Sequence, residues 1–403
     1  MKSIYVVAMV AILIGAMKSE SCAQKISTLE DFGKQVEKLW EVIIPIPPNP
    51  NHPSGLIYAP LKSGIAVLSV DGQSIYCYDF NGQLKWQAPG IQINSSNGAL
   101  YSSAAGEYLY LSYPIHEDAF TSAVYNADGQ LLWSAIYDSP FVVSPSGNYL
   151  ISMYDGLDQS MPLTILDIVS GRILWQINLL PSHPYWQAAA GQNDKMAYYN
   201  AGSLRLYDLK TGHLIWAKNV EAEPKGDVGE LHVSLEGNVI SYSNLKGAID
   251  NEQRVIYFFN ENGELVWRRT QPFIPNKTNG GLVGGISEDG EFVNINDLSD
   301  FSIYTIKSQK KLLTITENPP SGITMFTQEA IAFYPWKEGT RVMTLTKYGT
   351  IKNDYTLNQF IDFRSEKRSL YFNKVQNDSQ FTAMLIELVN NQFALSKFNL
   401  KLQ

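Results

Sequence analysis

LYDLKTGHLIW, residues 206–216, is the clearest copy of a short phrase that recurs along this sequence. The phrase begins with strand-forming residues, passes through a turn that contains Asp208 and Gly212, and resumes in a segment that carries Trp216. Glycine permits the positive φ of a tight hairpin turn, and an Asp side chain caps such a turn by hydrogen bonding to its backbone. The phrase therefore predicts a β-hairpin.

Five copies of the phrase place a Trp four residues after the turn glycine. The pairs are Gly82 and Trp86, Gly129 and Trp133, Gly171 and Trp175, Gly212 and Trp216, and Gly263 and Trp267. Three further turns, near residues 309, 349 and 391, lack the Trp, and successive turns lie 40–51 residues apart. This period suits units of four short strands. Because side chains alternate along a strand, we expect every repeat Trp to face the same way and to pack between neighbouring units.

These residues resemble the pyrroloquinoline-quinone-like (PQQ-like) β-propeller repeat, whose pattern is Ala-x-Asp-x-x-Thr-Gly-x-x-x-Trp. The matching positions are Asp208, Thr211, Gly212 and Trp216 in one copy and Asp167, Gly171 and Trp175 in another. The resemblance covers residues 56–403 and implies an all-β fold, a single eight-bladed β-propeller. Seven blades are the alternative, because the unit at residues 370–400 lacks both Gly and Trp. Within the family, the chain resembles the non-enzymatic branch that includes the outer-membrane barrel-assembly lipoprotein.

The resemblance also raises the possibility of a quinone-dependent dehydrogenase. Such enzymes are longer, bind the quinone through a calcium site, and in many cases carry adjacent cysteines. This chain has only Cys22 and Cys77. Its five histidines follow no zinc-site spacing, and it contains neither a phosphate-binding Walker loop nor a Gly-x-Ser-x-Gly motif. We therefore expect no enzymatic activity, no cofactor and no bound metal, with a quinone dehydrogenase or another loop-site enzyme as the alternative.

The first 23 residues have the pattern of an export signal. Lys2 precedes an apolar core at residues 4–17, which is too short to span a bilayer comfortably, and small residues precede a cleavage point after Ala23. The pattern predicts a secreted or periplasmic protein. Lipid anchoring through Cys22 is the minor alternative, because residues 19–21 make a poor lipidation motif.

Residues 24–55 form the next expected region. Apolar residues between Leu29 and Trp40 recur at helical spacing, which predicts one short amphipathic helix, and a proline-rich linker follows at residues 45–55. We expect the first strand of the ring at residues 55–60, where it would close the propeller against the last blade.

Charge and loop composition indicate the class of partner. The formal net charge of −8 argues against a general nucleic-acid binder, and no segment after the signal reaches the ~20 apolar residues of a membrane span. Loops of the second and third units carry histidines, carboxylates and aromatics, which suit a metal or carbohydrate site. These residues are His116, Glu117, Asp118, Phe120, Asp155, Asp158, His183, Tyr185 and Trp186. Longer loops at residues 221–230, 245–254 and 268–280 have mixed charge, which favours a protein partner. We expect a monomer that binds a protein or an extracellular polymer and acts as a scaffold.

Overall fold

The computed structural model describes the chain in segments of regular β-structure and the turns between them. These segments are residues 24–26, 36–44, 57–68, 74–79, 81–89, 99–103, 105–116, 119–138, 140–152, 162–178, 186–200, 202–220, 230–246, 253–272, 283–297, 300–315, 322–325, 329–336, 339–346, 351–357, 368–374, 381–389 and 392–400. All the regular secondary structure within them is β-strand. The described part of the chain is therefore all-β, as the sequence predicts for residues 56–403.

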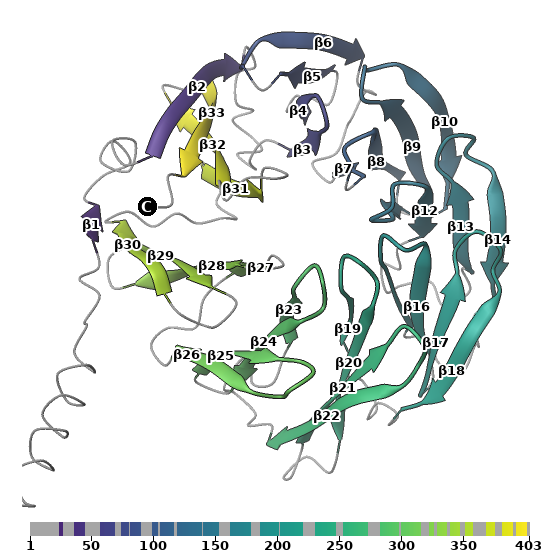
Figure 1. Ribbon diagram of the computed structural model, residues 1–403. Helices are drawn as coiled ribbons and strands as arrows, with labels where there is room; N and C mark the ends of the chain where they lie inside the picture. Colours follow the sequence, from purple (N-terminus) through teal and green to yellow (C-terminus); the bar gives the residue numbers. More distant parts are fainter. Residues whose placement is uncertain are drawn as a thin grey trace, which may run out of the picture.

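Most sheets consist of four antiparallel strands that follow one another in the chain (Figure 1). The first four sheets are β3 (Ile57–Leu61), β4 (Gly64–Leu68), β5 (Ser74–Tyr78) and β6 (Leu84–Pro89); β7 (Ala99–Ser102), β8 (Tyr108–His116), β9 (Ala119–Asn126) and β10 (Leu131–Tyr137); β11 (Phe141–Val143), β12 (Tyr149–Ser152), β13 (Leu163–Asp167) and β14 (Ile173–Ile177); and β15 (Trp186–Ala190), β16 (Lys195–Asn200), β17 (Ser203–Asp208) and β18 (Leu214–Asn219).

The later strands continue this arrangement. They are β19 (Glu230–Val233), β20 (Val239–Lys246), β21 (Gln253–Asn260) and β22 (Leu265–Pro272); β23 (Val283–Ile286), β24 (Phe292–Asp297), β25 (Asp300–Thr305) and β26 (Lys311–Ile315); β27 (Gly322–Met325), β28 (Glu329–Trp336), β29 (Gly339–Thr346) and β30 (Ile351–Leu357); and β31 (Arg368–Lys374), β32 (Phe381–Val389) and β33 (Gln392–Leu400). Two N-terminal strands, β1 (Gln24–Ile26) and β2 (Val36–Ile44), join the last two sheets.

The sheets stand side by side around a ring, with the first strand of each sheet innermost (Figure 1). First strands of neighbouring sheets contact one another, as β15 and β19 do. Middle strands are covered on both faces by adjacent sheets, so that all five residues of β4 (GIAVL) are buried. Fourth strands lie at the rim and are much more exposed, as in β18. The core consists of apolar clusters between neighbouring sheets, and one cluster contains residues from β12, β13, β16 and β17.

The predicted N-terminal helix is wrong for the residues that the structure describes there. Val36–Ile44 is strand β2, which pairs antiparallel with β33 from Val36↔Leu400 to Ile44↔Phe393. Residues 27–35 lie outside the described segments. The apolar residues of this segment are spaced as in a helix, and a bulge between Lys38 and Trp40 fits them into a strand. The β-branched residues of β2 also favour a strand once a partner strand is available. Tertiary pairing therefore overrides the local helical pattern.

The strand predicted at residues 55–60 is present, but its predicted role as the strand that closes the last blade is wrong. Ile57–Leu61 is β3, the inner strand of the first sheet, whereas β2 is the rim strand of the sheet ordered β2-β33-β32-β31. The N- and C-terminal parts of the chain thus share one sheet, in which β33 is paired on one side with β32 and on the other with β2. Strand β1 adds in parallel to the rim side of β30, from Gln24↔Tyr355 to Ile26↔Leu357.

This arrangement explains why the last unit lacks the repeat phrase. The sequence analysis places an eighth repeat turn near residue 391, between β32 and β33. In the preceding sheets the phrase joins the third strand to the fourth, whereas β32 and β33 are the second and third strands of their sheet. The fourth strand, β2, comes from the other end of the chain, so no turn connects it to β33. The turn near 391 is therefore not a copy of the repeat turn.

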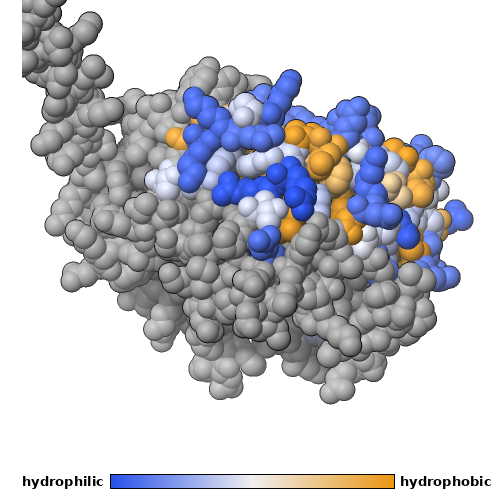
Figure 2. Space-filling view, turned by 90° about the horizontal axis from the view of Figure 1, so that it is seen from below, coloured by the Kyte–Doolittle hydropathy of each residue, from blue (hydrophilic) through white to orange (hydrophobic). Residues whose placement is uncertain are grey.

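The rim strands carry a recurring exposed apolar residue. Two residues after each turn glycine stands a Leu or Ile that is between 43% and 54% exposed. These residues are Leu84, Leu131, Ile173, Leu214 and Leu265. Leu132 and Ile136 on β10, and Leu174 on β14, are exposed as well. A view onto the rim shows hydrophobic residues in patches among hydrophilic ones over the part of this surface that the structure describes (Figure 2).

Candidate functional site

The repeat turn is held by the side chain of its first residue. In the turn after β17, Asp208 Oδ1 accepts hydrogen bonds from the backbone N of Thr211, at 2.8 Å, and from Thr211 Oγ1, at 2.7 Å. Gly212 closes the turn with φ of 70°. The Thr211 hydroxyl, followed by the backbone N–H groups, lowers the pKa of Asp208 below its ordinary value of 3.8. Asp167 and Ser170 make the same pair of contacts.

Shorter turns reach the same result with a different cap. Asn126 Oδ1 accepts from the backbone N of Asp128, at 3.0 Å, and of Gln130, at 2.9 Å. Asp79 and Asn260 cap their turns by the same pattern. In both turn lengths the capping side chain thus accepts hydrogen bonds from backbone N–H groups of the turn itself.

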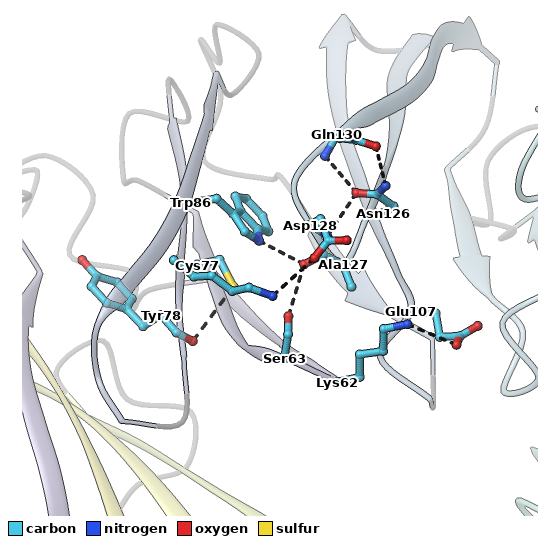
Figure 3. Close-up of polar contacts among 11 residues, drawn as sticks. Lys62, Ser63, Cys77, Tyr78, Trp86, Glu107, Asn126, Ala127, Asp128 and Gln130 are labelled. Carbon is cyan, nitrogen blue, oxygen red and sulfur yellow. Dashed lines mark hydrogen bonds and ion pairs between the residues drawn. The ribbon is translucent and has the colours of Figure 1, made fainter.

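Each of four repeat Trp side chains docks on the turn of the following sheet. The indole Nε1 donates to a backbone carbonyl there: Trp86 to Ala127 at 3.0 Å, Trp133 to Ile168 at 2.7 Å, Trp175 to Leu209 at 2.7 Å, and Trp216 to Glu261 at 3.0 Å. Figure 3 shows the first of these contacts, in which Ser63 Oγ donates to the same carbonyl of Ala127. The rings lie against the turn glycines Gly129, Gly171, Gly212 and Gly263. The repeat Trp residues are packing elements between sheets, as the sequence predicts.

Trp267, the fifth repeat Trp, packs in a different environment. It is 8% exposed and stacks on Phe258, with ring centroids 5.0 Å apart, and against Tyr304 of the next sheet at 5.6 Å. The following turn has Gln309 in the glycine position, with φ of 58°. The positive φ of the turn is thus kept beyond the last Gly-and-Trp pair, although a non-glycine residue adopts it there.

A second repeated turn, not predicted from the sequence, is present in the structure. It joins the first two strands of a sheet, and in four copies a Ser is followed three residues later by a Gly with positive φ. The four pairs are Ser103 and Gly106, Ser144 and Gly147, Ser234 and Gly237, and Ser287 and Gly290. Each Ser Oγ accepts a hydrogen bond from the backbone N five residues on, as Ser144 does from Tyr149 at 3.1 Å. The Ser-x-x-Gly spacing would have revealed these turns.

The structure only partly places the loop residues proposed as a metal or carbohydrate site. His116 ends β8 and pairs with Ala119, Phe120 lies in β9, and Trp186 begins β15. The remaining members, Glu117, Asp118, Asp155, Asp158, His183 and Tyr185, lie outside the described residues. Within the described part of the chain, no three His, Cys, Asp or Glu side chains are grouped as metal ligands. The loop site stays a prediction.

A cavity of about 620 Å³ lies among the inner strands β11, β15 and β19. Its described lining is mostly small or apolar and includes three consecutive alanines, Ala188 to Ala190. Glu230 and His232 are the only ionisable side chains among those lining residues, and Gln187 is a polar neighbour. Glu230 Oε2 and His232 Nε2 are 3.9 Å apart. This open cavity combines a mostly apolar lining with a few polar groups, as ligand sites do.

The repeat pattern in the sequence does not point to these cavity residues. Glu230 appeared only as the end of a long loop, and His232 only as one of five scattered histidines. The sequence does contain a local pattern that indicates the strand carrying them. Polar and apolar residues alternate at positions 230–233, immediately before the Ser-x-x-Gly turn at Ser234. That pattern is typical of a strand with one polar face.

Comparison with known proteins now decides the family. A family model described as "Outer membrane protein assembly factor BamB" matches residues 71–314, which is more than half of the 403-residue chain. The chain belongs to this PQQ-like, BamB-like family. The match confirms the resemblance carried by the Asp, Gly and Trp positions of the repeat. Among curated protein sequences no significant match is found.

One solved structure supports the likeness at the level of the fold alone. A crystal structure described as that of the eukaryotic initiation factor has a TM-score of 0.55 at 12% identity, covering 88% of this chain and 91% of that chain. An Hsv2 protein from Kluyveromyces marxianus has a TM-score of 0.47 at 10% identity, covering 75% and 98%. At these identities the first likeness shows the fold alone, and the second carries no argument. No helix in the described part of this BamB-like chain is long and apolar enough to cross a membrane.

Proposed function

We propose that this chain is an exported, non-catalytic, eight-bladed β-propeller that binds another protein through its rim. The blade count is supported by seven sheets of consecutive strands and by the mixed sheet that β2 completes with β31–β33. Membership of a family described as an outer-membrane protein assembly factor supports a role in binding other polypeptides outside the cytoplasm. The N-terminal sequence supports export.

The exposed apolar residues on the rim carry the proposal. Leu132 and Ile136 stand on β10, Leu174 stands on the next rim strand, β14, and Ile136 is 65% exposed. Both strands end the order of their sheets, so their outer backbone edges have no neighbouring strand among the described residues. Apolar side chains beside open strand edges are typical of surfaces that associate with polypeptides.

Polypeptide is also the partner that best fits the chemistry of this surface. An extended chain can hydrogen-bond to the edge of a rim strand while its side chains pack on the apolar residues beside that edge. Strand β1 shows that a rim edge of this fold accepts an added strand, because Gln24–Ile26 pairs in parallel with β30. A polyanion would gain little from a chain with a net charge of −8.

Site-specific photo-crosslinking in the native host tests the rim interface. A photoreactive phenylalanine is placed at Ile136 or at Leu174, and the matched control is placed at Lys210, which is exposed on a repeat turn. The proposal predicts a protein adduct at both rim positions with a yield well above that at Lys210. Equal or lower yields at the two rim positions would contradict it.

Two further measurements test export and the lack of catalysis. Mass spectrometry of the mature protein should find an N-terminus at Gln24, whereas a lipid-modified Cys22 would support anchoring instead. Incubation with the quinone and calcium should yield no bound chromophore and no dye-linked alcohol oxidation. Oxidation above the background of a heat-denatured sample would favour the dehydrogenase alternative.

A further inference from the structure

We propose that the cavity among β11, β15 and β19 binds an organic cation, an ammonium or guanidinium group carried on an apolar stem. The cavity has a volume of about 620 Å³, which lies within the range of small-molecule sites. It is lined by strands of three successive sheets and is separate from the rim residues discussed above. The two sites therefore stand on independent observations.

The charge of the lining selects a cation. Among the described lining residues, Glu230 and His232 are the only side chains that ionise. Among these described lining residues, the Glu230 carboxylate is the one anionic group. An anionic ligand would meet that carboxylate at short range, whereas a cation would be attracted to it.

Hydrogen bonding points the same way. Glu230 Oε2 and His232 Nε2 are buried atoms that lack a hydrogen-bond partner among the described residues. A carboxylate only accepts hydrogen bonds, and a neutral imidazole with its proton on Nδ1 accepts at Nε2. Buried acceptors without partners are rare, because each loses its hydration without compensation. The two atoms lie 3.9 Å apart, so a group with several N–H donors can bond both once a side-chain rotation turns them toward the cavity.

The rest of the lining suits an apolar stem. Ala188, Ala189 and Ala190 leave space where larger side chains would fill it, and Val142, Ile151 and Leu231 add apolar surface. Within the described segments no third His, Cys, Asp or Glu joins Glu230 and His232. Two ligands alone do not define a metal site, so the geometry favours an organic cation.

Isothermal titration calorimetry on the mature chain tests the site with a matched pair of probes. The cationic probe is n-butylguanidinium, and n-butylurea is its uncharged analogue. We expect saturable binding of the guanidinium and none of the urea. Binding should weaken by about tenfold or more in Glu230→Gln, because the variant removes the charge but keeps the side-chain shape. Glu236→Gln, on an exposed turn, is the control and should bind as the wild type does.

A second variant distinguishes binding inside the cavity from binding elsewhere on the protein surface. Ala189→Leu fills space in the cavity without changing charge, and it should also reduce guanidinium binding at least tenfold, with circular dichroism confirming the fold. Comparing n-butylguanidinium with the capped peptide Gly-Arg-Gly distinguishes a small-molecule guanidinium ligand from an Arg side chain of a polypeptide, since the preferred source binds more tightly. No saturable binding of either probe, equal binding of the urea, or unchanged binding by Glu230→Gln would overturn the proposal.

Discussion

The indole of Trp175 lies directly against Gly212, the turn glycine of the following sheet. A Cβ added to Gly212 would stand 2.9 Å from Cγ of Trp175, closer than carbon atoms pack. Trp175 Nε1 also donates to the carbonyl of Leu209 in the same turn, at 2.7 Å. The glycine thus has two roles, since it adopts φ of 70° and leaves room for the ring that joins two sheets.

Gly212→Ala should therefore destabilise the protein by roughly 2–4 kcal/mol. The left-handed conformation costs a non-glycine residue about 1–2 kcal/mol, and displacement of the Trp175 ring adds a packing cost of similar size. Urea denaturation followed by tryptophan fluorescence measures the change.

Gly285→Ala is the matched control for that substitution. An added Cβ at Gly285 meets its nearest atoms, both on Asn294, at 3.8 Å, which is ordinary contact distance, and its φ is not positive. The account predicts a change within about 1 kcal/mol at Gly285. Equal losses at the two glycines would show that the Trp contact and the positive φ do not matter.

Gln309→Gly should stabilise the protein by up to about 1 kcal/mol. Gln309 stands where other repeats have glycine and holds φ of 58°, a conformation that disfavours a side chain. Glycine relieves that strain but loses more entropy on folding, so the net gain is modest. The midpoint of chemical unfolding measures it. Gln309→Ala keeps the Cβ and should give no gain, and destabilisation by the glycine variant would contradict this interpretation.

The repeat phrase made most of the ring predictable, because its information is local. The Asp208 cap, the positive φ of Gly212 and the register of Trp216 depend on residues within one hairpin, so sequence spacing reports them directly. Docking of Trp216 on the next turn followed from the repetition itself, since an identical side chain at the same register meets an identical neighbour each time.

Features set by distant parts of the chain were not predictable in this way. Val36 pairs with Leu400, and no residue near Val36 in the sequence indicates a partner strand at the other end of the chain. Local spacing therefore favoured a helix that long-range pairing replaces. The cavity also escaped notice, because Ala189 and His232 come from different sheets and become neighbours only when the ring forms.

Thr211→Val should raise the pKa of Asp208 toward its ordinary value of 3.8. The Thr211 hydroxyl is the main cause of the lowered pKa, and valine removes that donor while keeping the shape. NMR titration of the carboxyl group measures the change. Asp79 is the internal control, because its lowered pKa arises first from the backbone N–H of Gln83 and should not move.

The same substitution has a defined effect on the pH dependence of stability. A carboxyl whose pKa is lower in the folded state stabilises the fold above its unfolded pKa, and the contribution is lost as pH falls through the folded pKa. In Thr211→Val, the free energy of unfolding should therefore fall less steeply than in the wild type as the pH drops below about 4. An unchanged Asp208 titration would show that the hydroxyl contact does not govern this turn.

Thermal unfolding of Trp216→Ala tests most directly the central claim that the repeat Trp residues join neighbouring sheets into one ring. Trp216 donates to Glu261 at 3.0 Å and lies against Gly263, so its loss should cost roughly 3 kcal/mol and lower the melting temperature by several degrees. Trp216→Phe keeps an aromatic ring, so its melting temperature should lie between those of Trp216→Ala and the wild type. Leu214→Ala, at an exposed position of the same strand, should change the melting temperature little. A melting temperature for Trp216→Ala equal to that of the wild type would contradict the claim.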